Sequence, residues 1–189
     1  ITWNKLIKRD VIVKNNITFD VKLSHNHDVD FSIRLMLGAK SYSWLNGVGY
    51  YYRSNDNGIT ATKRSDPTNV LKILIGLNKL VESSHKVLKR SFDNYVVDMI
   101  AGTLVKYGDD INRRREVFDF AHNTVVPDLG LSGKGDDYFF THQTEVFRLI
   151  ETGEYDKYIT YINTPRRKLR AKLRKIYDAA QEILSRFIV

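Results

Sequence analysis

The chain has 189 residues with 42% hydrophobic and 28% charged side chains and a formal net charge of +8, a composition typical of a folded globular protein. It contains no cysteine, which excludes disulfides and thiolate metal ligands and favours a reducing, cytoplasmic setting. No apolar run approaches the roughly 20 residues that cross a bilayer, and the N-terminal residues lack the pattern of a secretory signal. Because the chain starts at Ile1, we expect it to be part of a longer polypeptide.

Residues 1–65 predict mixed secondary structure. Apolar side chains over residues 29–37 are typical of a short buried helix that ends at Gly38. Residues 40–45 alternate polar and apolar side chains, and residues 49–53 are rich in tyrosine, so we expect two strands joined by a turn. This region is therefore predicted to be α/β.

Helical patterns dominate residues 66–163. Asp66 followed by Pro67 is typical of a helix start, and apolar side chains continue at helical spacing as far as Leu88. Further helices are predicted at about 92–107, 111–122 and 138–151, with a loop over residues 125–137. The predicted fold class is thus an α/β segment followed by a mainly α-helical region.

The last predicted element, over residues 164–189, is a basic amphipathic helix. It holds eight basic and two acidic residues, so most of the net charge of the chain lies there. Its apolar side chains alternate spacings of four and three and are Leu169, Leu173, Ile176, Ala180, Ile183 and Phe187. The pattern fits a helix docked on its own domain or on a second subunit, and it also fits a helix on an anionic membrane surface.

The segment Ser24-His25-Asn26-His27-Asp28-Val29-Asp30-Phe31 contains two histidines and two carboxylates and has three interpretations. His25 and His27 would share one face of an extended strand, as a pair of metal ligands does. The His-x-His-x-Asp-His pattern of metallohydrolases, however, requires Asp and His where this chain has Val29 and Asp30, which disfavours a metal site. A solvated helix start is the simplest alternative.

The third interpretation is an acid/base site at Asp28. A carboxylate beside the free N–H groups of a helix start is stabilised as the anion, so it can accept a proton from a hydroxyl. Phe31 and Leu35 follow it at helical spacing and would hold the backbone in place.

Six short segments in the first 60 residues, taken together, make this third interpretation specific. They are Trp3-Asn4-Lys5-Leu6-Ile7-Lys8-Arg9, Asn16-Ile17-Thr18-Phe19, His27-Asp28-Val29-Asp30-Phe31, Ala39-Lys40, Tyr50-Tyr51-Tyr52-Arg53 and Gly58-Ile59-Thr60. Their order and spacing resemble the acceptor-side half of bacterial family 2, GT-A type, glycosyltransferases. The resemblance covers residues 1–65 and is looser in the helices that follow.

The resemblance implies a role for several residues. Asp28 would be the catalytic base, which deprotonates the acceptor hydroxyl as it attacks the anomeric carbon of a nucleotide sugar with inversion. The acceptor-binding residues would be Trp3, His27 and Tyr51, and the loop over the donor diphosphate would contain Arg53, Ser54 and Thr60. The chain departs from the family at His27, where the family has an acidic residue, and at Gly58, where it often has serine.

The nucleotide-binding half of such an enzyme is not recognisable in this chain. The family holds Mg²⁺ or Mn²⁺ on the donor diphosphate with an Asp-x-Asp motif at a strand end. Asp28-Val29-Asp30 has this form, but the preceding residues 21–25 are not a buried strand, so we expect no metal site here and no activity from the chain alone.

The expected partners are thus a nucleotide-sugar donor and a glycan, polyol or lipid-linked acceptor in bacterial surface polysaccharide synthesis. The expected place is the cytoplasm, at the inner face of the membrane where the basic helix would lie. The alternative is a non-enzymatic helical interaction or oligomerisation module with a basic surface-binding tail. Nucleic acid is disfavoured, because the aromatic residues cluster at 42–52 and the basic ones at 166–175.

Overall fold

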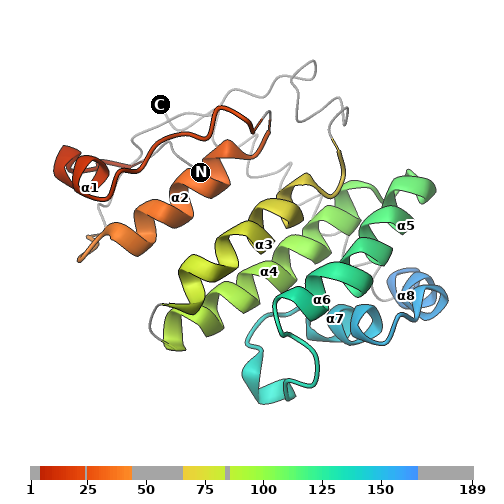
Figure 1. The fold of residues 1–189 in the computed structure, drawn as a ribbon. Helices are drawn as coiled ribbons and strands as arrows, with labels where there is room; N and C mark the ends of the chain where they lie inside the picture. Colours follow the sequence, from red (N-terminus) through yellow and green to blue (C-terminus); the bar gives the residue numbers. More distant parts are fainter. Residues whose placement is uncertain (1–4, 24, 44–65, 84–85, 166–189) are drawn as a thin grey trace, which may run out of the picture.

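The computed structural model describes residues 5–23, 25–43, 66–83 and 86–165 (Figure 1). All the regular elements in these ranges are helices. They are α1 (Arg9–Lys14), α2 (His27–Gly38), α3 (Asn69–Glu82), α4 (Lys86–Lys106), α5 (Ile111–Phe120), the π-helical η1 (Ala121–Val125), α6 (Val126–Asp128), the 3-10 helix η2 (Asp136–Tyr138), α7 (Thr144–Glu151) and α8 (Tyr155–Ile162).

The prediction of an α/β fold is wrong, because the described ranges contain no strand. Residues 40–43, which were expected to start the first strand, are irregular. The Tyr42 hydroxyl donates a hydrogen bond to the Met36 carbonyl, so this segment folds back on the end of α2 instead of pairing with a neighbour. The second predicted strand, at residues 49–53, lies outside the described residues.

Helix α2 packs on two apolar clusters at once. Phe31 and Leu35 are buried with Ile17 in a small cluster beside α1. Val29 and Ile33, on the other face, pack against the main core. Two opposed apolar faces on one helix fix both its position and its rotation about its own axis.

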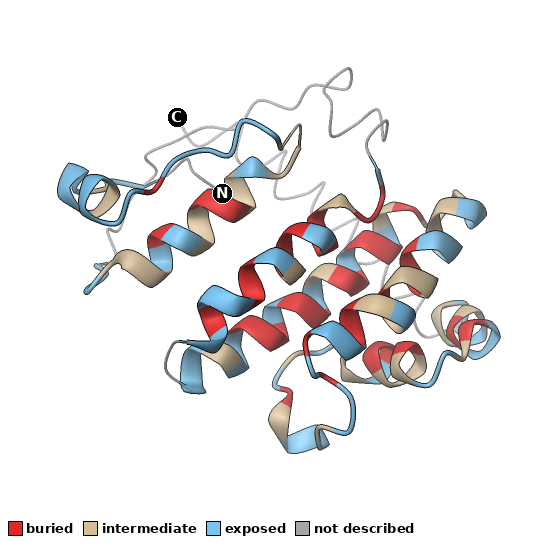
Figure 2. Cartoon of the chain, viewed as in Figure 1, coloured by how far each residue is buried: buried red, intermediate tan, exposed pale blue. Residues whose placement is uncertain are grey.

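The main core lies between α3 and α4, which run side by side, and extends under α5 and α7 (Figures 1 and 2). Five of its large, fully buried aliphatic side chains recur at helical spacing on these two helices and are Leu71, Leu74 and Leu77 of α3 and Ile100 and Leu104 of α4. Burying each such side chain stabilises the fold by roughly 1.5–3 kcal/mol.

Helix α3 starts later than its sequence predicts. Residues 67 and 68 form a turn, and Thr68 is the N-cap residue. The Asp66 carboxylate accepts hydrogen bonds from the Thr68 amide at 2.8 Å and from the Thr68 hydroxyl at 2.7 Å. Asp66 therefore caps the turn that leads into the helix.

The helix predicted over 138–151 is wrong in its first half, since α7 starts at Thr144. Asn94 of α4 explains the difference, because its Oδ1 accepts hydrogen bonds from the amides of Phe140 and Thr141 at 2.7 and 3.2 Å. These amides are therefore held by a side chain from another helix and not by a helical turn of their own.

Candidate functional site

The candidate site lies where α2 and α3 begin, beside the last turns of α4 (Figure 1). The Asn69 side chain donates a hydrogen bond to the His25 carbonyl at 3.1 Å and so ties the residues before α2 to the first turn of α3. Asn26, the N-cap residue of α2, has a φ of 57°, a left-handed conformation that asparagine tolerates. This bend turns the chain into α2 next to α3.

The two carboxylates of the segment have different surroundings. Asp30 is buried, and both of its oxygens accept hydrogen bonds from the Arg34 Nε, at 3.0 and 2.9 Å. Asp28 lies in the first turn of α2 and is half-buried. Residues two apart on a helix point in widely different directions, so Asp28 and Asp30 do not converge on one cation.

The predicted acceptor-binding residue His27 is exposed and packs edge-on against Phe19, with ring centroids 5.7 Å apart. Phe19 in turn stacks on Phe31 at 4.3 Å. His27 thus covers the small cluster beside α1.

The charge of Asp28 affects the pKa of Tyr95 on α4. Burial raises the pKa of the Tyr95 phenol, and the negative charge of Asp28 raises this pKa further. Tyr95 lies on the face of α4 that also carries, at intervals of three or four residues, Met99, Thr103 and Lys106.

A cavity of about 190 Å³ opens along the same face. It is smaller than the roughly 300–1,000 Å³ of pockets that bury drug-sized ligands, so it fits one small group. Its walls come from the start of α2, the start of α3 and the end of α4, and they are Asn26, Asp66, Pro67, Val70, Met99, Gly102, Thr103, Lys106 and Tyr107.

The two charged side chains of the cavity differ in their partners. Partial burial alone would raise the pKa of Asp66, but hydrogen bonds from Lys72 and Thr68 outweigh it and hold the pKa below its ordinary value. Lys72 Nζ lies 2.7 Å from this carboxylate. Lys106, by contrast, lies over the Tyr107 ring at 5.4 Å, and no ion pair among the described residues includes it.

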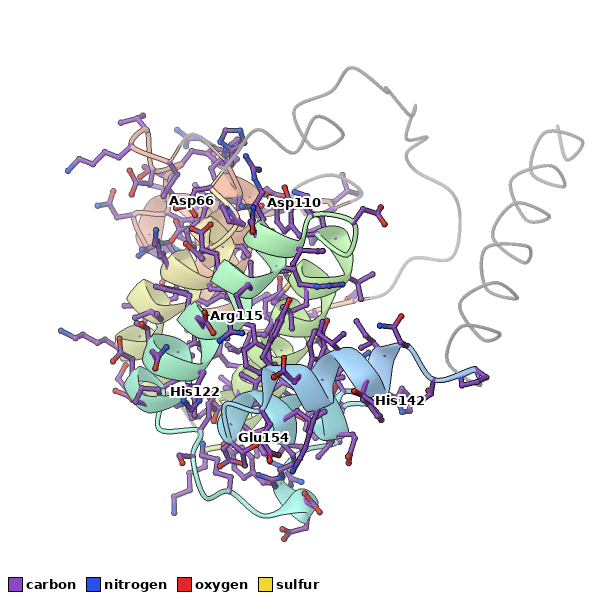
Figure 3. The ribbon with its side chains drawn as sticks, turned by 90° about the vertical axis from the view of Figure 1, so that its right-hand side faces the viewer. Asp66, Asp110, Arg115, His122, His142 and Glu154 are labelled. Carbon is purple, nitrogen blue, oxygen red and sulfur yellow. The ribbon has the colours of Figure 1, made fainter. Side chains whose placement is uncertain are left out.

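The other predicted site residues, Trp3, Tyr51, Arg53, Ser54 and Thr60, lie outside the described residues. Within the described ranges no three histidine or carboxylate side chains gather as metal ligands would. His122 and His142 lie well apart (Figure 3). His122 Nδ1 is 2.9 Å from the Ile150 carbonyl, so this histidine joins η1 to α7.

A buried polar cluster around Asp93 was missed by the sequence analysis. The Asp93 carboxylate is fully buried and pairs with Lys89, with Lys134 at 2.6 Å and with the Tyr138 hydroxyl at 2.6 Å. The sequence contained one sign of this cluster. Asp93 precedes the apolar Val96 and Val97 by three and four residues, so on a helix its carboxylate lies on the same face as they do. The cluster joins α4 to the loop before α7 and is structural.

A second depression, of about 270 Å³, lies between Arg115 of α5 and the start of α8. It is a shallow surface feature, since the Arg115 guanidinium lies flat over the Tyr155 ring at 4.5 Å and pairs with Asp119 at 2.9 Å. Arg115 and Glu154 mark its edges in Figure 3. Its charged groups already have partners within the chain.

Comparison with protein-family models, with curated proteins and with solved structures finds no match to this chain. In the ranges that the structure describes, no helix is both long and apolar enough to cross a membrane.

Proposed function

We propose that this chain is the acceptor-side part of an inverting glycosyltransferase that moves a sugar from a nucleotide-sugar donor to a glycan, polyol or lipid-linked acceptor. The observation that carries the proposal is the position of Asp28. Its carboxylate lies in the first turn of α2, two residues after Asn26, which lines the cavity beside α4. The family resemblance of residues 1–65 supports the same role.

The proposed reaction follows from this position. The acceptor hydroxyl passes its proton to the Asp28 carboxylate while its oxygen forms the bond to the anomeric carbon of the donor. The bond from this carbon to the diphosphate breaks, and its electron pair leaves with the nucleoside diphosphate. Attack on the face opposite to the leaving group inverts the anomeric centre.

The surroundings of Asp28 suit a general base. Asp28 lies in the first turn of α2, at the positive end of the helix dipole. The two apolar clusters on which α2 packs fix its position, which general-base geometry requires. A divalent cation on the donor diphosphate would be bound by a nucleotide-binding half with the family's Asp-x-Asp motif.

The test is nucleotide release from a panel of nucleotide sugars by the full-length protein, with Mn²⁺ and a mixed glycan acceptor. We expect Asp28→Asn to lower release at least 100-fold, the usual scale of a general base, while donor binding persists. Asp10→Asn is the matched control, because Asp10 is also in the first turn of a helix but is exposed and paired with Lys14. Equal release by wild type and Asp28→Asn would refute the proposal.

A second candidate is a non-enzymatic interaction module, which the wholly helical architecture of the described residues favours. It predicts that a folded full-length protein binds no nucleotide sugar and that Asp28→Asn changes nothing. The same release assay, together with donor titration, separates the two candidates.

A further inference from the structure

We propose that the cavity beside α4 binds a negatively charged unit of the acceptor, a carboxylate-bearing sugar or a phosphate-bearing polyol, and that Lys106 pairs with its charge. This inference rests on the proposed function and adds the chemical class of the acceptor.

The walls of the cavity combine apolar and polar groups. Val70, Pro67 and Met99 supply apolar contacts, while Asn26 supplies an amide that can both donate and accept hydrogen bonds. Thr103 donates its own hydroxyl proton to the Met99 carbonyl at 2.7 Å, which leaves its oxygen lone pairs as acceptors. Such a mixture matches a sugar or polyol, which has apolar C–H faces and hydroxyl groups at its rim.

The charges of the cavity decide the class of ligand. The Asp66 carboxylate is already bonded by Lys72 and by both the amide and the hydroxyl of Thr68, so its charge is compensated inside the chain. Lys106 is half-buried, and its ammonium group lies over the Tyr107 ring in a cation–π contact. Arg113 also lies over this ring, at 5.7 Å, but its guanidinium is 3.6 Å from the Asp110 carboxylate, so its charge is compensated inside the chain. An anion is therefore the ligand that this end of the cavity attracts.

The cavity extends along α4 from Met99 to Lys106, seven residues or about 10 Å at 1.5 Å per residue. Its wall also includes Asn26, which comes two residues before Asp28. An acceptor in the cavity can therefore place its charge at Lys106 while another part of it lies towards the proposed base.

The test is direct titration of the full-length protein with three probes: a trimer of galacturonic acid, its neutral methyl ester and a trimer of glycerol phosphate. We expect the wild type to bind at least one anionic trimer and to bind the ester at least tenfold more weakly. If only the galacturonic acid trimer binds, the acceptor carries carboxylates. If only the glycerol phosphate trimer binds, the acceptor carries phosphates.

Two variants connect binding to the cavity. Lys106→Met keeps the apolar stem and should lower anion affinity about tenfold or more. Gly102→Leu places a side chain in the cavity from an exposed position whose Cβ has no neighbour within 4 Å, so folding should persist while binding is lost. Lys79→Met is the control, because Lys79 is likewise a lysine in the last turn of its helix but does not line the cavity.

The inference is overturned if no anionic trimer binds to the wild type, if the ester binds equally well, or if Lys106→Met and Lys79→Met behave alike. These outcomes are independent of the Asp28 assay. If Asp28→Asn loses nucleotide release but Lys106→Met binds anions as the wild type does, the inference about the cavity is wrong and the proposed function stands. If anion binding depends on Lys106 but Asp28→Asn releases nucleotide as the wild type does, the proposed function is wrong and the anion site stands.

Discussion

The Tyr138 hydroxyl donates a hydrogen bond of 2.6 Å to the Asp93 carboxylate, which is fully buried on the core face of α4. Removal of this donor in Tyr138→Phe leaves a buried charge with one partner fewer. Hydrogen bonds to charged groups contribute about 1.5–3 kcal/mol, so we expect the free energy of unfolding to fall by about this amount in urea titrations.

The control for this variant is Tyr95→Phe, since Tyr95 is on α4, the helix that carries Asp93, but is 38% exposed. Its effect should stay within about 0.5 kcal/mol. A Tyr138→Phe protein as stable as Tyr95→Phe would show that the two lysines alone satisfy Asp93.

Tyr138 also makes stability depend on pH in the alkaline range. Burial, together with the hydrogen bond to Asp93 and its charge, raises the pKa of this phenol above its ordinary value of 10.0. The stabilisation is therefore fully present below pH 10 and is lost as the pH rises through the pKa of the folded state. We expect the unfolding free energy of the wild type to fall above pH 10 by about 1.4 kcal/mol per pH unit more than that of Tyr138→Phe. Parallel curves for the two proteins would contradict this assignment.

The Asp30–Arg34 ion pair within α2 contributes to the stability of the fold, because it satisfies a buried carboxylate. Asp30 is 4% exposed, and in Arg34→Met its carboxylate loses both of its 2.9–3.0 Å contacts with the guanidinium. We expect a loss of about 1.5–3 kcal/mol in unfolding free energy. Lys14→Met, which breaks the exposed Asp10–Lys14 pair of α1, should cost less than about 1 kcal/mol. Equal effects would mean that Asp30 finds other donors when Arg34 is removed.

Asn78 offers a substitution that should stabilise the protein. Its side chain is buried in α3, its Nδ2 donates to Glu82 at 2.7 Å, and its Oδ1 has no hydrogen-bond partner among the described residues. A buried acceptor without a partner costs roughly 1–3 kcal/mol, so Asn78→Leu should raise the thermal midpoint, which calorimetry would measure. Asn78→Ala is the control, because it also removes the amide but leaves a void. A lower midpoint for Asn78→Leu would mean that its larger volume strains the core.

The helices of the core could be predicted because their signal is local. Val70, Leu74, Leu77 and Val81 repeat at the period of a helix, and the structure buries all four, whereas Leu88, which was expected to continue the pattern, is 46% exposed. The late start of α7 could not be predicted, because a side chain from a distant part of the chain determines it. Asn94 illustrates this, since it holds amides more than 40 residues away.

The strand prediction failed for a related reason. Alternation over a few residues is weak support for a strand, and the exposed Tyr42 bonds to the end of α2. The position of Asp28 at a helix start followed from local pattern alone. Its relation to Tyr95 and the cavity did not, because α4 lies more than 60 residues further along the chain.

Gly102 lines the cavity and also affects the unfolding free energy, because it is a glycine within a helix. It lies within α4 at an exposed position, and a Cβ there would have no neighbour within 4 Å. Glycine within a helix costs about 0.8–1.0 kcal/mol relative to alanine, so Gly102→Ala should raise the unfolding free energy by about this amount. Gly108→Ala is the control, because its Cβ would lie 3.1 Å from the Val105 carbonyl oxygen and should give no such gain. If Gly102→Ala is stabilised and still binds anionic trimers while Gly102→Leu does not, the loss in Gly102→Leu reflects the volume of the cavity and not damage to α4.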